Sequence, residues 1–590
     1  MDKNEIIQRG KDYIAQEKDE HFRREVEELI EKDDMVELED RFYRNLEFGT
    51  GGLRGIIAGG TNRMNPFVIN NATQGLADYV IKAKPDKAAE GKLKAVVAFD
   101  SRHFSDVFAE ATALIFVANG FTTYLFDGMR PTPELSYAIR ELGCDTGVVV
   151  TASHNPPQYN GYKAYWDNGA QVTPPHDVGI IACVNSVAKV KTISKDEALK
   201  SGKLKIIGDE FDQKFQEMIK SQLFRPQLIK EKASEVKVVY TPLHGTGAMH
   251  VEKVLGDLGL SVITVPEQRE GNGDFPTVDF PNPEVPSALK MAIDLAKKEN
   301  ADVVMATDPD ADRFGSAVPD GKGDYVLITG NQMGVLLTDY ILLCREELGK
   351  MPKNPAVIRS IVTSAMVDRL CEKRGVYLAE CLTGFKWIAS VTEDFLRTGD
   401  HSYVFGYEES YGYTVEAEIR DKDGVSAAAL CAEMTLYWRS KGKSLLDRLN
   451  ELFCEFGYFE DVSISQNFPG NSGTIEMANI MEKLRRDGLK TLAGKKVEKI
   501  RDVQESVVFS PENMNEKTEI SLPKSNVLQF YLEDGTIVSA RPSGTEPKIK
   551  FYINCPVQVE NGDLAKAKAA AKDFCDKISK EISSVLSASK

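Results

Sequence analysis

The chain has 590 residues, with 73 Lys and Arg residues against 89 Asp and Glu residues and a formal net charge of -16. This length suits roughly four domains of about 150 residues each, and the net acidity argues against nucleic-acid and anionic-membrane partners, which require basic patches. The nine scattered cysteines form no Cys-x-x-Cys pair and no segment has the ~20 apolar residues of a membrane span, so we expect a cytoplasmic protein without a zinc site.

The first part of the chain predicts helices followed by α/β units. Residues 3–46 are rich in Glu, Lys, Arg and Leu at helical spacing and lead into a glycine-rich stretch, residues 48–55. Continuous apolar runs at 95–99 and 147–150 flank a helix-like segment at 108–117. Such runs are typical of strands buried on both faces of a parallel sheet. The glycine-rich stretch is either a flexible joint or a second place where the backbone approaches an anion, and it lacks the spacing of a dinucleotide-binding fingerprint.

Ser153 directly follows the second of these strands, in a segment that reads Thr-Ala-Ser-His-Asn-Pro from residue 151. A serine next to a histidine is usually ordinary loop chemistry, and the flanks are not the Gly-x-Ser-x-Gly elbow of an acyl hydrolase. The strand end, and Lys163 ten residues later as a candidate proton carrier or phosphate partner, favour a covalent role. A phosphorylated Ser153 would carry roughly -1.5 to -2 charges and would bind a metal strongly.

Later apolar runs predict further α/β units, at residues 236–240, 302–306, 358–362 and 403–405. His244 follows the first of these runs, and we interpret it as structural because most isolated histidines are. Open parallel sheets bind ligands beyond the carboxyl ends of their strands, so the loops after these runs could face one cleft.

Three aspartates spaced two residues apart, Asp308, Asp310 and Asp312, follow the run at 302–306. On a helix the middle carboxylate would point away, and in an extended strand the outer pair would lie ~13 Å apart, so only a tight loop can bring all three to one ion. Pro309 favours such a loop. The alternative is a solvated acidic turn.

The residues after the triplet exclude a calcium loop of the EF-hand type. Arg313 and Pro319 stand where that loop needs Gly and Glu. Three carboxylates on a short rigid loop, with a further ligand from a phosphoryl oxygen, suit Mg²⁺ better.

Two more loops carry candidate ligand-binding groups. The segment 405–412 contains Glu408 and Ser410, which could accept and donate hydrogen bonds to sugar hydroxyls, although adjacent glutamates usually face solvent. Near the C-terminus, alternating strands at 535–540 and 549–553 enclose a loop with two hydroxyls, a glycine and two cations, followed by a helix at 564–585. This loop resembles a phosphate cradle, because backbone N–H groups and hydroxyls fix phosphate oxygens while an arginine binds two of them.

These segments predict four domains with boundaries near Pro/Gly-rich or charged joints. We expect three consecutive α/β domains with mixed or parallel sheets, at residues 1–205, 206–320 and 321–450. A smaller α+β domain at 451–590 would complete the molecule around a central cleft.

Together, the loops at 151–156, 308–313, 406–410 and 541–547 resemble the four signature loops of the α-D-phosphohexomutase family, in the family's order. Residues 48–55 are similar to its N-terminal arginine loop. The Glu-Glu-Ser sequence in the third loop, and the segment 382–387, resemble the branch of phosphoglucomutases and phosphopentomutases rather than the dual phosphomannomutases. Ala311 stands where glycine is common in the family's metal loop, a conservative departure.

The resemblance implies an isomerase that moves a phosphoryl group within a phosphosugar through a phosphoserine and a glucose 1,6-bisphosphate intermediate, as a monomer or homodimer. It implies that Ser153 carries the phosphoryl group and that Asp308, Asp310 and Asp312 bind Mg²⁺ with a phosphoserine oxygen. It assigns catalysis to Arg54, His154 and Lys163. It assigns substrate contacts to Arg313, Thr383, Lys386, Glu408, Ser410, Arg541, Ser543, Gly544, Thr545 and Lys548.

Two other functions remain open from the residues. A metal phosphatase could use Asp308 as its nucleophile, which would leave Ser153 without a role. A phosphosugar-binding protein without activity could share the fold. Within the mutase hypothesis, glucose is the expected sugar, with pentose and mannose phosphates as alternatives.

Overall fold

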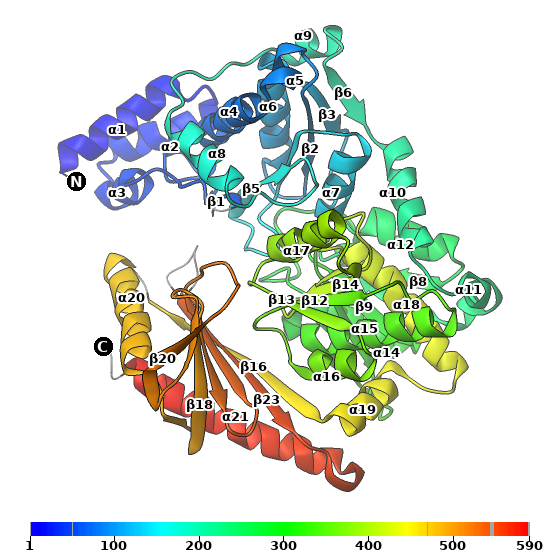
Figure 1. Ribbon diagram of the computed structural model, residues 1–590. Coiled ribbons are helices and arrows are strands. Elements are labelled where there is room, and N and C mark those ends of the chain that lie inside the picture. The colour runs from blue at the N-terminus through cyan, green and yellow to red at the C-terminus, as the bar shows by residue number, and fades with distance from the viewer. Residues whose placement is uncertain (1, 50, 469, 543–547, 588–590) are drawn as a thin grey trace. The chain divides into compact units, whose positions relative to one another are not determined.

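The computed structural model describes residues 2–49, 51–468, 470–542 and 548–587 and divides into two compact units (Figure 1). The first unit is Met1–Ile328 with Tyr411–Tyr437, and the second is Thr329–Ser410 with Trp438–Lys590. None of the helices in the described ranges is long and apolar enough to cross a membrane.

Three helices open the first unit and correspond to the predicted helical region 3–46. They are α1 (Lys3–Gln16), α2 (Glu20–Glu31) and α3 (Met35–Phe42). Their apolar faces form a small core of their own from Ile6, Tyr13, Val26, Leu38 and Phe42. Phe22 on the other side of α2 is fully buried in the core of the following sheet, which anchors the three helices to it.

The first sheet has the strand order β1-β5-β4-β2-β3-β6. Strands β2, β3, β4 and β6 run parallel, and β5 returns antiparallel to β4 and pairs with β1. Its strands are β1 (Gly52–Ile56), β2 (Lys94–Phe99), β3 (Thr122–Phe126), β4 (Thr146–Val150), β5 (Tyr159–Trp166) and β6 (Leu204–Ile207). Its helices are α4 (Pro66–Ala83), α5 (Pro85–Ala89), α6 (Ser105–Ala118), α7 (Thr132–Glu141), α8 (His176–Asn185) and α9 (Lys195–Lys200).

The two apolar runs predicted as buried strands are β2 and β4, and both faces of each are covered. Val97 and Val150 belong to a core that α4 and α6 also line, whereas Val96 and Val149 belong to a second core with residues of α7. Because neighbouring side chains of a strand point to opposite faces, helices on both sides of the sheet require continuous rather than alternating apolar residues.

The second sheet has the order β11-β10-β9-β7-β8 and lies in the same unit. Its strands are β7 (Lys237–Thr241), β8 (Ser261–Thr264), β9 (Val303–Thr307), β10 (Phe314–Pro319) and β11 (Tyr325–Ile328). Strand β7 is parallel to β8 and β9, and β10 returns antiparallel to β9. The accompanying helices are α10 (Asp209–Ser221), α11 (Pro226–Lys232), α12 (Ala248–Asp257), α13 (Pro266–Arg269) and α14 (Lys290–Glu299), with short 3-10 turns η1 (Ala233–Glu235) and η2 (Pro286–Leu289).

The boundary expected at residue 320 lies inside the hairpin of β10 and β11. These strands pair from Ser316 with Ile328 to Pro319 with Tyr325, and Gly321 and Gly323 have the positive φ angles of the connecting turn. Glycines at a hairpin turn and glycines of a linker look alike in a sequence, because both supply conformations that other residues avoid.

The second unit contains a parallel array in the order β13-β12-β14. Its strands are β12 (Pro355–Ser360), β13 (Tyr377–Cys381) and β14 (Ser402–Glu408), and its helices are α15 (Gly330–Glu347), α16 (Met366–Lys373), α17 (Phe385–Thr398) and α19 (Leu445–Phe456). The helix α18 (Gly424–Ser440) begins in the first unit.

The three α/β sheets share one plan, as predicted. A central strand (β2, β7 or β12) is flanked by the next two strands of the chain, both parallel to it. Ser153, the aspartate triplet and Glu408 each lie at the carboxyl end of the third strand of this plan, namely β4, β9 and β14.

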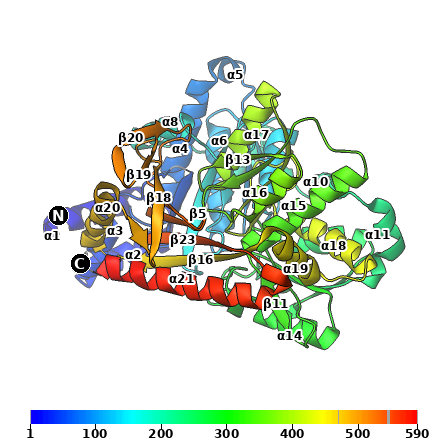
Figure 2. The same cartoon turned by 60° about the horizontal axis from the view of Figure 1, so that its bottom comes forward.

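The C-terminal domain is an antiparallel sheet in the order β16-β23-β22-β21-β18-β19-β20, with β17 paired to β18. Its strands are β16 (Tyr458–Asn467), β17 (Thr491–Leu492), β18 (Lys495–Asp502), β19 (Val507–Ser510), β20 (Asn513–Glu519), β21 (Leu528–Leu532), β22 (Ile537–Pro542) and β23 (Lys548–Val557). The helices are α20 (Gly470–Asp487), α21 (Leu564–Ser587) and the 3-10 turn η3 (Glu560–Gly562). Figure 2 shows α21 lying along β16 and β23, which it contacts.

The strand expected at 535–540 is shifted toward the C-terminus. Gly535 has a φ of 86° and its N–H donates to the Leu532 carbonyl, so it belongs to the preceding turn. Arg541 and Lys548, expected in a loop, instead lie in β22 and β23, where Arg541 pairs with Lys550. Both strands therefore extend further than the sequence suggests.

Candidate active site

Ser153 lies three residues beyond β4 in a left-handed backbone conformation, with a φ of 51°. Few residues other than glycine adopt this conformation, because steric clashes disfavour it for residues with a Cβ. Its Oγ donates a hydrogen bond to Asp308 Oδ2 at 2.6 Å and lies 3.1 Å from His154 Nδ1. The residue is only 4% exposed, so the hydroxyl is shielded from bulk water.

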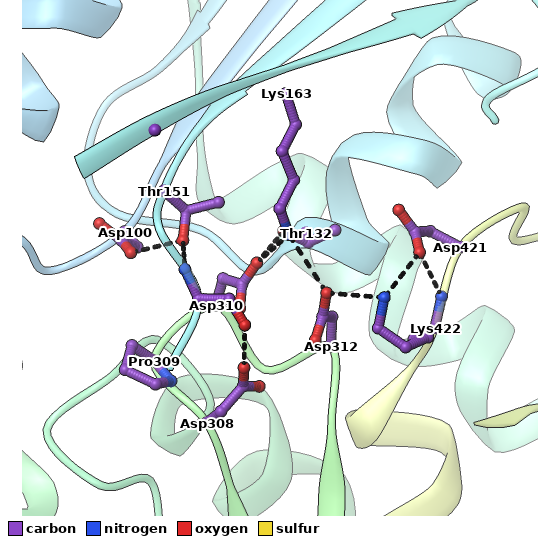
Figure 3. A network of polar contacts seen from close by, with 12 residues as sticks. Asp100, Thr132, Thr151, Lys163, Asp308, Pro309, Asp310, Asp312, Asp421 and Lys422 are labelled. Carbon is purple, nitrogen blue, oxygen red and sulfur yellow. Dashed lines mark hydrogen bonds and ion pairs between the residues drawn. The ribbon is translucent and has the colours of Figure 1, made fainter. Parts of the chain in front are cut away.

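The aspartate triplet forms a tight loop between β9 and β10, as predicted. Ala311 has a φ of 50°, and its N–H donates to the Asp308 carbonyl at 2.9 Å, which turns the chain between the second and third aspartates. One carboxylate oxygen from each of Asp308, Asp310 and Asp312 lies within 4.8 Å of the others, and all three residues are buried (Figure 3). The solvated acidic turn considered above does not describe this loop.

Two carboxylate oxygens of the triplet have no hydrogen-bond partner among the described residues: Asp310 Oδ1 and Asp312 Oδ1. Buried polar atoms nearly always have partners, so orphaned oxygens indicate a missing ligand. Convergent carboxylate oxygens are the donor set of a hard divalent cation. The residues therefore fit Mg²⁺.

Two lysines neutralise part of the charge of the triplet. Lys163 Nζ, from β5, lies 2.7 Å from Asp310 Oδ2 and 3.2 Å from Asp312 Oδ2. Lys422 Nζ lies 3.1 Å from Asp312 Oδ2. Figure 3 shows the two ammonium groups approaching Asp312 from different elements. Metal and ammonium groups would thus compete for the same carboxylates.

The charges of the cluster are strongly coupled. Burial, and then repulsion by Asp310 and Asp312, raises the pKa of Asp308 well above its ordinary value. Burial acts in the same direction on Asp312, but Lys422 and Lys163 outweigh it and lower the pKa of that carboxyl. Burial lowers the pKa of Lys163, whereas Asp310 and Asp312 raise it more. A cation bound by the three carboxylates would relieve the repulsion that raises the pKa of Asp308.

Two helix beginnings hold the aspartate loop in place. At the first residue of α7, Thr132 donates its N–H to the Asp310 carbonyl at 2.9 Å and its hydroxyl to Asp310 Oδ2 at 2.7 Å. Before α12, the Thr246 N–H donates to the Pro309 carbonyl at 2.8 Å. A Cβ at Gly245 would lie 2.3 Å from Pro309 Cα, so only glycine permits this approach. The positive ends of both helices also favour the carboxylates.

His154 is neutral in this environment. Burial, followed by the nearby charges of Arg313 and Arg54, lowers the pKa of His154 well below its ordinary value. Arg54, on β1, donates from Nη1 to Asn155 Oδ1 at 3.2 Å, and the Arg313 N–H donates to Asp308 Oδ1 at 3.0 Å. The predicted catalytic residues of the first unit thus gather around the Ser153 hydroxyl and the aspartate loop.

The candidate sugar-binding residues lie in the second unit. Glu408 is buried at the end of β14, and Ser410 follows it. Glu409 Oε2 accepts a hydrogen bond from Ser360 Oγ at 3.0 Å, and burial together with repulsion by Glu408 raises the pKa of Glu409 to about 7. The Thr383 hydroxyl is buried without a hydrogen-bond partner among the described residues.

The remaining described candidates lie in α17 and in the strands β22 and β23. Lys386 is the second residue of α17, with its ammonium 5.7 Å from the Trp387 ring centroid. Arg541 bonds the Tyr552 side chain, and Lys548 begins β23. Ser543, Gly544 and Thr545 lie outside the described residues.

Lys422, Thr132 and Arg102 are among the polar residues that contact the predicted site and that sequence reasoning missed. Lys422 precedes the helix α18 and Thr132 begins the helix α7. Neither residue directly follows an apolar run that would mark a strand end. Arg102 follows β2, so the rule that identified Ser153 could have found it. His244 has a structural contact, as predicted: its Nε2 lies 2.8 Å from Thr277 Oγ1.

Four family models match consecutive parts of the chain. Their descriptions are phosphoglucomutase/phosphomannomutase alpha/beta/alpha domains I, II and III and the C-terminal domain, and they match residues 45–191, 213–321, 329–456 and 481–571. Together they cover most of the chain in the order that the loops predicted.

Individual proteins agree with the family models. A protein of Schizosaccharomyces pombe named "Probable phosphoribomutase" is 35% identical over an alignment of 554 residues that covers 92% of each chain. A phosphoglucomutase of Staphylococcus saprophyticus is 33% identical over an alignment of 543 residues that covers 91% of this chain and 95% of the relative. The structure of a Paramecium phosphoglucomutase matches 93% of this chain and 95% of its own with a TM-score of 0.67 at 18% identity, which supports the fold.

Proposed function

Because the chain belongs to the phosphoglucomutase/phosphomannomutase family, we propose that it interconverts α-D-glucose 1-phosphate and glucose 6-phosphate by carrying a phosphoryl group on Ser153. The observation that carries the proposal is the 2.6 Å contact between Ser153 Oγ and Asp308 Oδ2 inside a buried carboxylate cluster. A phosphoryl group on this oxygen would enter the ligand shell of a cation held by the aspartates. The enzyme is thus an isomerase that works by intramolecular phosphotransfer.

Phosphoryl transfer needs charge neutralisation and alignment more than a strong nucleophile. Here the left-handed backbone at Ser153 aims the hydroxyl at the carboxylate cluster. The low exposure of the residue protects a phosphoserine from hydrolysis by water. Arg54 and Lys163 bring positive charge to the same region and would face the phosphoryl oxygens.

In the first half-reaction, the bond between phosphorus and Ser153 Oγ breaks and a bond forms to the free hydroxyl oxygen of the sugar phosphate. The sugar hydroxyl loses its proton and Ser153 Oγ gains one. Neutral His154 has Nδ1 3.1 Å from Oγ and can hold a proton there, and the Lys163 ammonium is a second carrier. The product, glucose 1,6-bisphosphate, reorients and returns its other phosphoryl group to Ser153 by the same steps in reverse.

We propose Mg²⁺ as the cation of the site, held by the three aspartates and a phosphoserine oxygen. When bound, it would supply the positive charge that phosphoryl oxygens require during transfer. The orphaned oxygens of Asp310 and Asp312 support this assignment.

We propose Arg313 as one substrate contact of the first unit. Glu408 and Ser410 would bind the sugar hydroxyls. Thr383 and Lys386, which lie between the end of β13 and the first turn of α17, would be further substrate contacts. The distal phosphate would be bound by a set that carries both hydroxyls and cations: Arg541, Ser543, Gly544, Thr545 and Lys548. Because the bisphosphate must present either end, one set of phosphate ligands serves both orientations.

We further propose that these parts belong to four domains at 1–205, 206–320, 321–450 and 451–590. The four separate family matches, each within one of these segments apart from the single residue 321 and residues 451–456, support this division. Expression of the segment 1–320 would test the second boundary, because that boundary cuts the hairpin of β10 and β11. A fragment that folds and binds Mg²⁺ would support it.

A second candidate substrate is a pentose phosphate. The relative named "Probable phosphoribomutase" shares 35% of its residues with this chain over 92% of its length. Comparison of kcat/KM for glucose, mannose, ribose and deoxyribose 1-phosphates decides between the sugars. A preference of tenfold or more for ribose or deoxyribose would replace glucose in the proposal.

The reaction class is tested with Mg²⁺ and a trace of glucose 1,6-bisphosphate in a coupled assay for glucose 6-phosphate. We expect turnover, and mass spectrometry should find phosphate on Ser153. Phosphate release without sugar isomerisation would indicate the metal phosphatase, and absence of turnover with every sugar 1-phosphate would indicate a binding protein.

A further inference from the structure

Arg102 is a buried arginine whose guanidinium group donates its hydrogen bonds mainly to backbone carbonyls of the loop that carries Ser153. Its side chain is 0% exposed. Nη1 donates to the carbonyls of Pro156 at 2.8 Å and Tyr159 at 2.9 Å, and Nη2 donates to the carbonyls of Ser153 and Asn155. One side chain thus gathers four backbone carbonyls of the segment 153–159.

The neighbouring Asp100 holds the other side of Ser153. Asp100 Oδ2 accepts the Thr151 hydroxyl at 2.6 Å, and Thr151 Oγ1 accepts the Ser153 N–H at 2.8 Å. Asp100 Oδ2 also lies 3.4 Å from Arg102 Nε. The Ser153 carbonyl is therefore fixed by Arg102, and the Ser153 N–H is fixed by Thr151, whose hydroxyl is held by Asp100 beyond the end of β2.

This double restraint matters because Ser153 has a φ of 51°. A left-handed conformation at a residue with a Cβ is unfavourable and persists only where the surroundings over-determine it. Release of the carbonyl would let the backbone return toward ordinary φ angles. The Oγ would then move away from Asp308.

A second segment of the first unit covers Arg102. The ring of Phe275 stacks over the guanidinium with its centroid 4.9 Å from Cζ, and Phe275 itself has a φ of 46°. A Cβ at Gly273 would lie 2.7 Å from the backbone N of His103, so the segment 271–275 packs closely on residues 101–103. His103 Nε2 and Asp274 Oδ1 lie 2.7 Å apart on the outer side.

We infer that Arg102 is the positioning residue of the phosphoryl carrier, and that the segment 271–275 acts as its cover. The guanidinium does not touch the reacting atoms. It holds the carbonyls of residues 153–159 so that Ser153 Oγ stays aimed at the carboxylate cluster. The inference rests on the proposed function, because it assigns Arg102 to the carrier Ser153.

The test compares Arg102→Lys and Arg102→Gln with the wild-type protein. Lysine keeps the charge but cannot reach four carbonyls in two directions, whereas glutamine removes the charge as well. A displacement of the reacting atom by about 1 Å lowers turnover about 100-fold, so we expect kcat to fall by about that factor in both variants while KM changes less than threefold. A loss in Arg102→Gln that Arg102→Lys restores would show that charge, and not position, is the contribution of Arg102.

A readout independent of turnover is backbone hydrogen exchange in peptides covering residues 151–161. We expect at least tenfold faster exchange there in Arg102→Lys, with the aspartate loop and the C-terminal domain unchanged. Equal exchange of this segment in both proteins would overturn the inference. If the wild-type protein converts no sugar phosphate, the proposed function fails, and the exchange experiment still tests whether Arg102 holds the loop.

The matched control is Arg130→Lys. Arg130 is a second buried arginine of the same unit, and its fork binds Asp212 at 2.7 and 2.9 Å instead of the Ser153 loop. Its replacement should lower stability and leave kcat within about threefold. Phe275→Leu tests the cover separately: it should lower kcat about tenfold and speed exchange of residues 153–159, and wild-type values of both would remove the cover from the inference.

Discussion

Replacement of Lys422 by methionine should lower the stability of the metal-free protein and tighten its binding of Mg²⁺. Lys422 Nζ lies 3.1 Å from Asp312 Oδ2, one of two ammonium contacts to that carboxylate. At an effective dielectric constant of about 20, this separation corresponds to an attraction of about 5 kcal/mol, and loss of one partner of a buried pair typically lowers stability by ~3–5 kcal/mol. Methionine keeps an unbranched apolar side chain that ends one atom earlier, without the ammonium charge and its hydrogen-bond donors.

Mg²⁺ should bind more tightly because the Lys422 ammonium and the cation compete for the Asp312 carboxylate. Without the Lys422 ammonium, the site is more negative by one charge, and a cation no longer displaces that partner. We expect Mg²⁺ to bind at least tenfold more tightly, which corresponds to ~1.4 kcal/mol. Saturating Mg²⁺ should therefore recover about a third to a half of the stability lost in its absence.

The measurements are thermal unfolding in EDTA and in saturating MgCl₂, and isothermal titration of the metal-free protein with MgCl₂. Lys290→Met is the control, because Lys290 pairs with Asp294 on an exposed helix surface and should alter neither quantity. Weaker Mg²⁺ binding in Lys422→Met, or an equal loss of Tm with and without metal, would refute the competition between lysine and metal.

Three further predictions concern the carrier, the sugar loop and the metal loop. Ser153→Ala should remove the phosphate seen by mass spectrometry and lower kcat by about 10⁴-fold or more, and normal turnover in this variant would eliminate the covalent route. Glu409→Gln should raise stability at pH 8 by about 3 kcal/mol and have little effect near pH 4, because the folded protein raises the pKa of Glu409 from 4.5 to about 7 and stability is lost as the pH rises through that interval. A pH-independent difference, or the same effect from exposed Glu372→Gln, would contradict it. Thr132→Val removes the 2.7 Å hydroxyl donation to Asp310 Oδ2 and should weaken Mg²⁺ binding about tenfold while substrate KM stays unchanged; unchanged titration curves would show that Thr132 does not orient the ligand.

The residues that sequence reasoning found share a local signature. Ser153, Asp308 and Glu408 each follow or end a continuous apolar run, and those runs are the buried strands β4, β9 and β14. The strand type follows from burial on both faces, and the position of the polar residue follows from the strand end. Both properties are local, so a short window of sequence contains them.

Other contacts depend on segments far apart in the chain. Lys422 reaches Asp312 across 110 positions of sequence, and Thr132 reaches Asp310 across 178. No window of residues around Lys422 contains the information that Asp312 lies nearby. The strand positions of Arg541 and Lys548 were missed for a different reason, since polar and charged residues at the end of a strand resemble those of a loop.

The equivalent positions of Ser153, the aspartates and Glu408 mean that three copies of one architectural module have taken separate duties. Under the proposed function, one copy would carry the covalent group, the second would contribute the carboxylates, and the third would contribute the groups that select the sugar. A change at the end of β14 would then alter which sugar is accepted while the residues beyond β4 and β9 stay as they are. Descent from a duplicated ancestral unit would explain such modularity, and exchange of residues 406–410 between relatives with different sugars is the corresponding route to redesigned specificity.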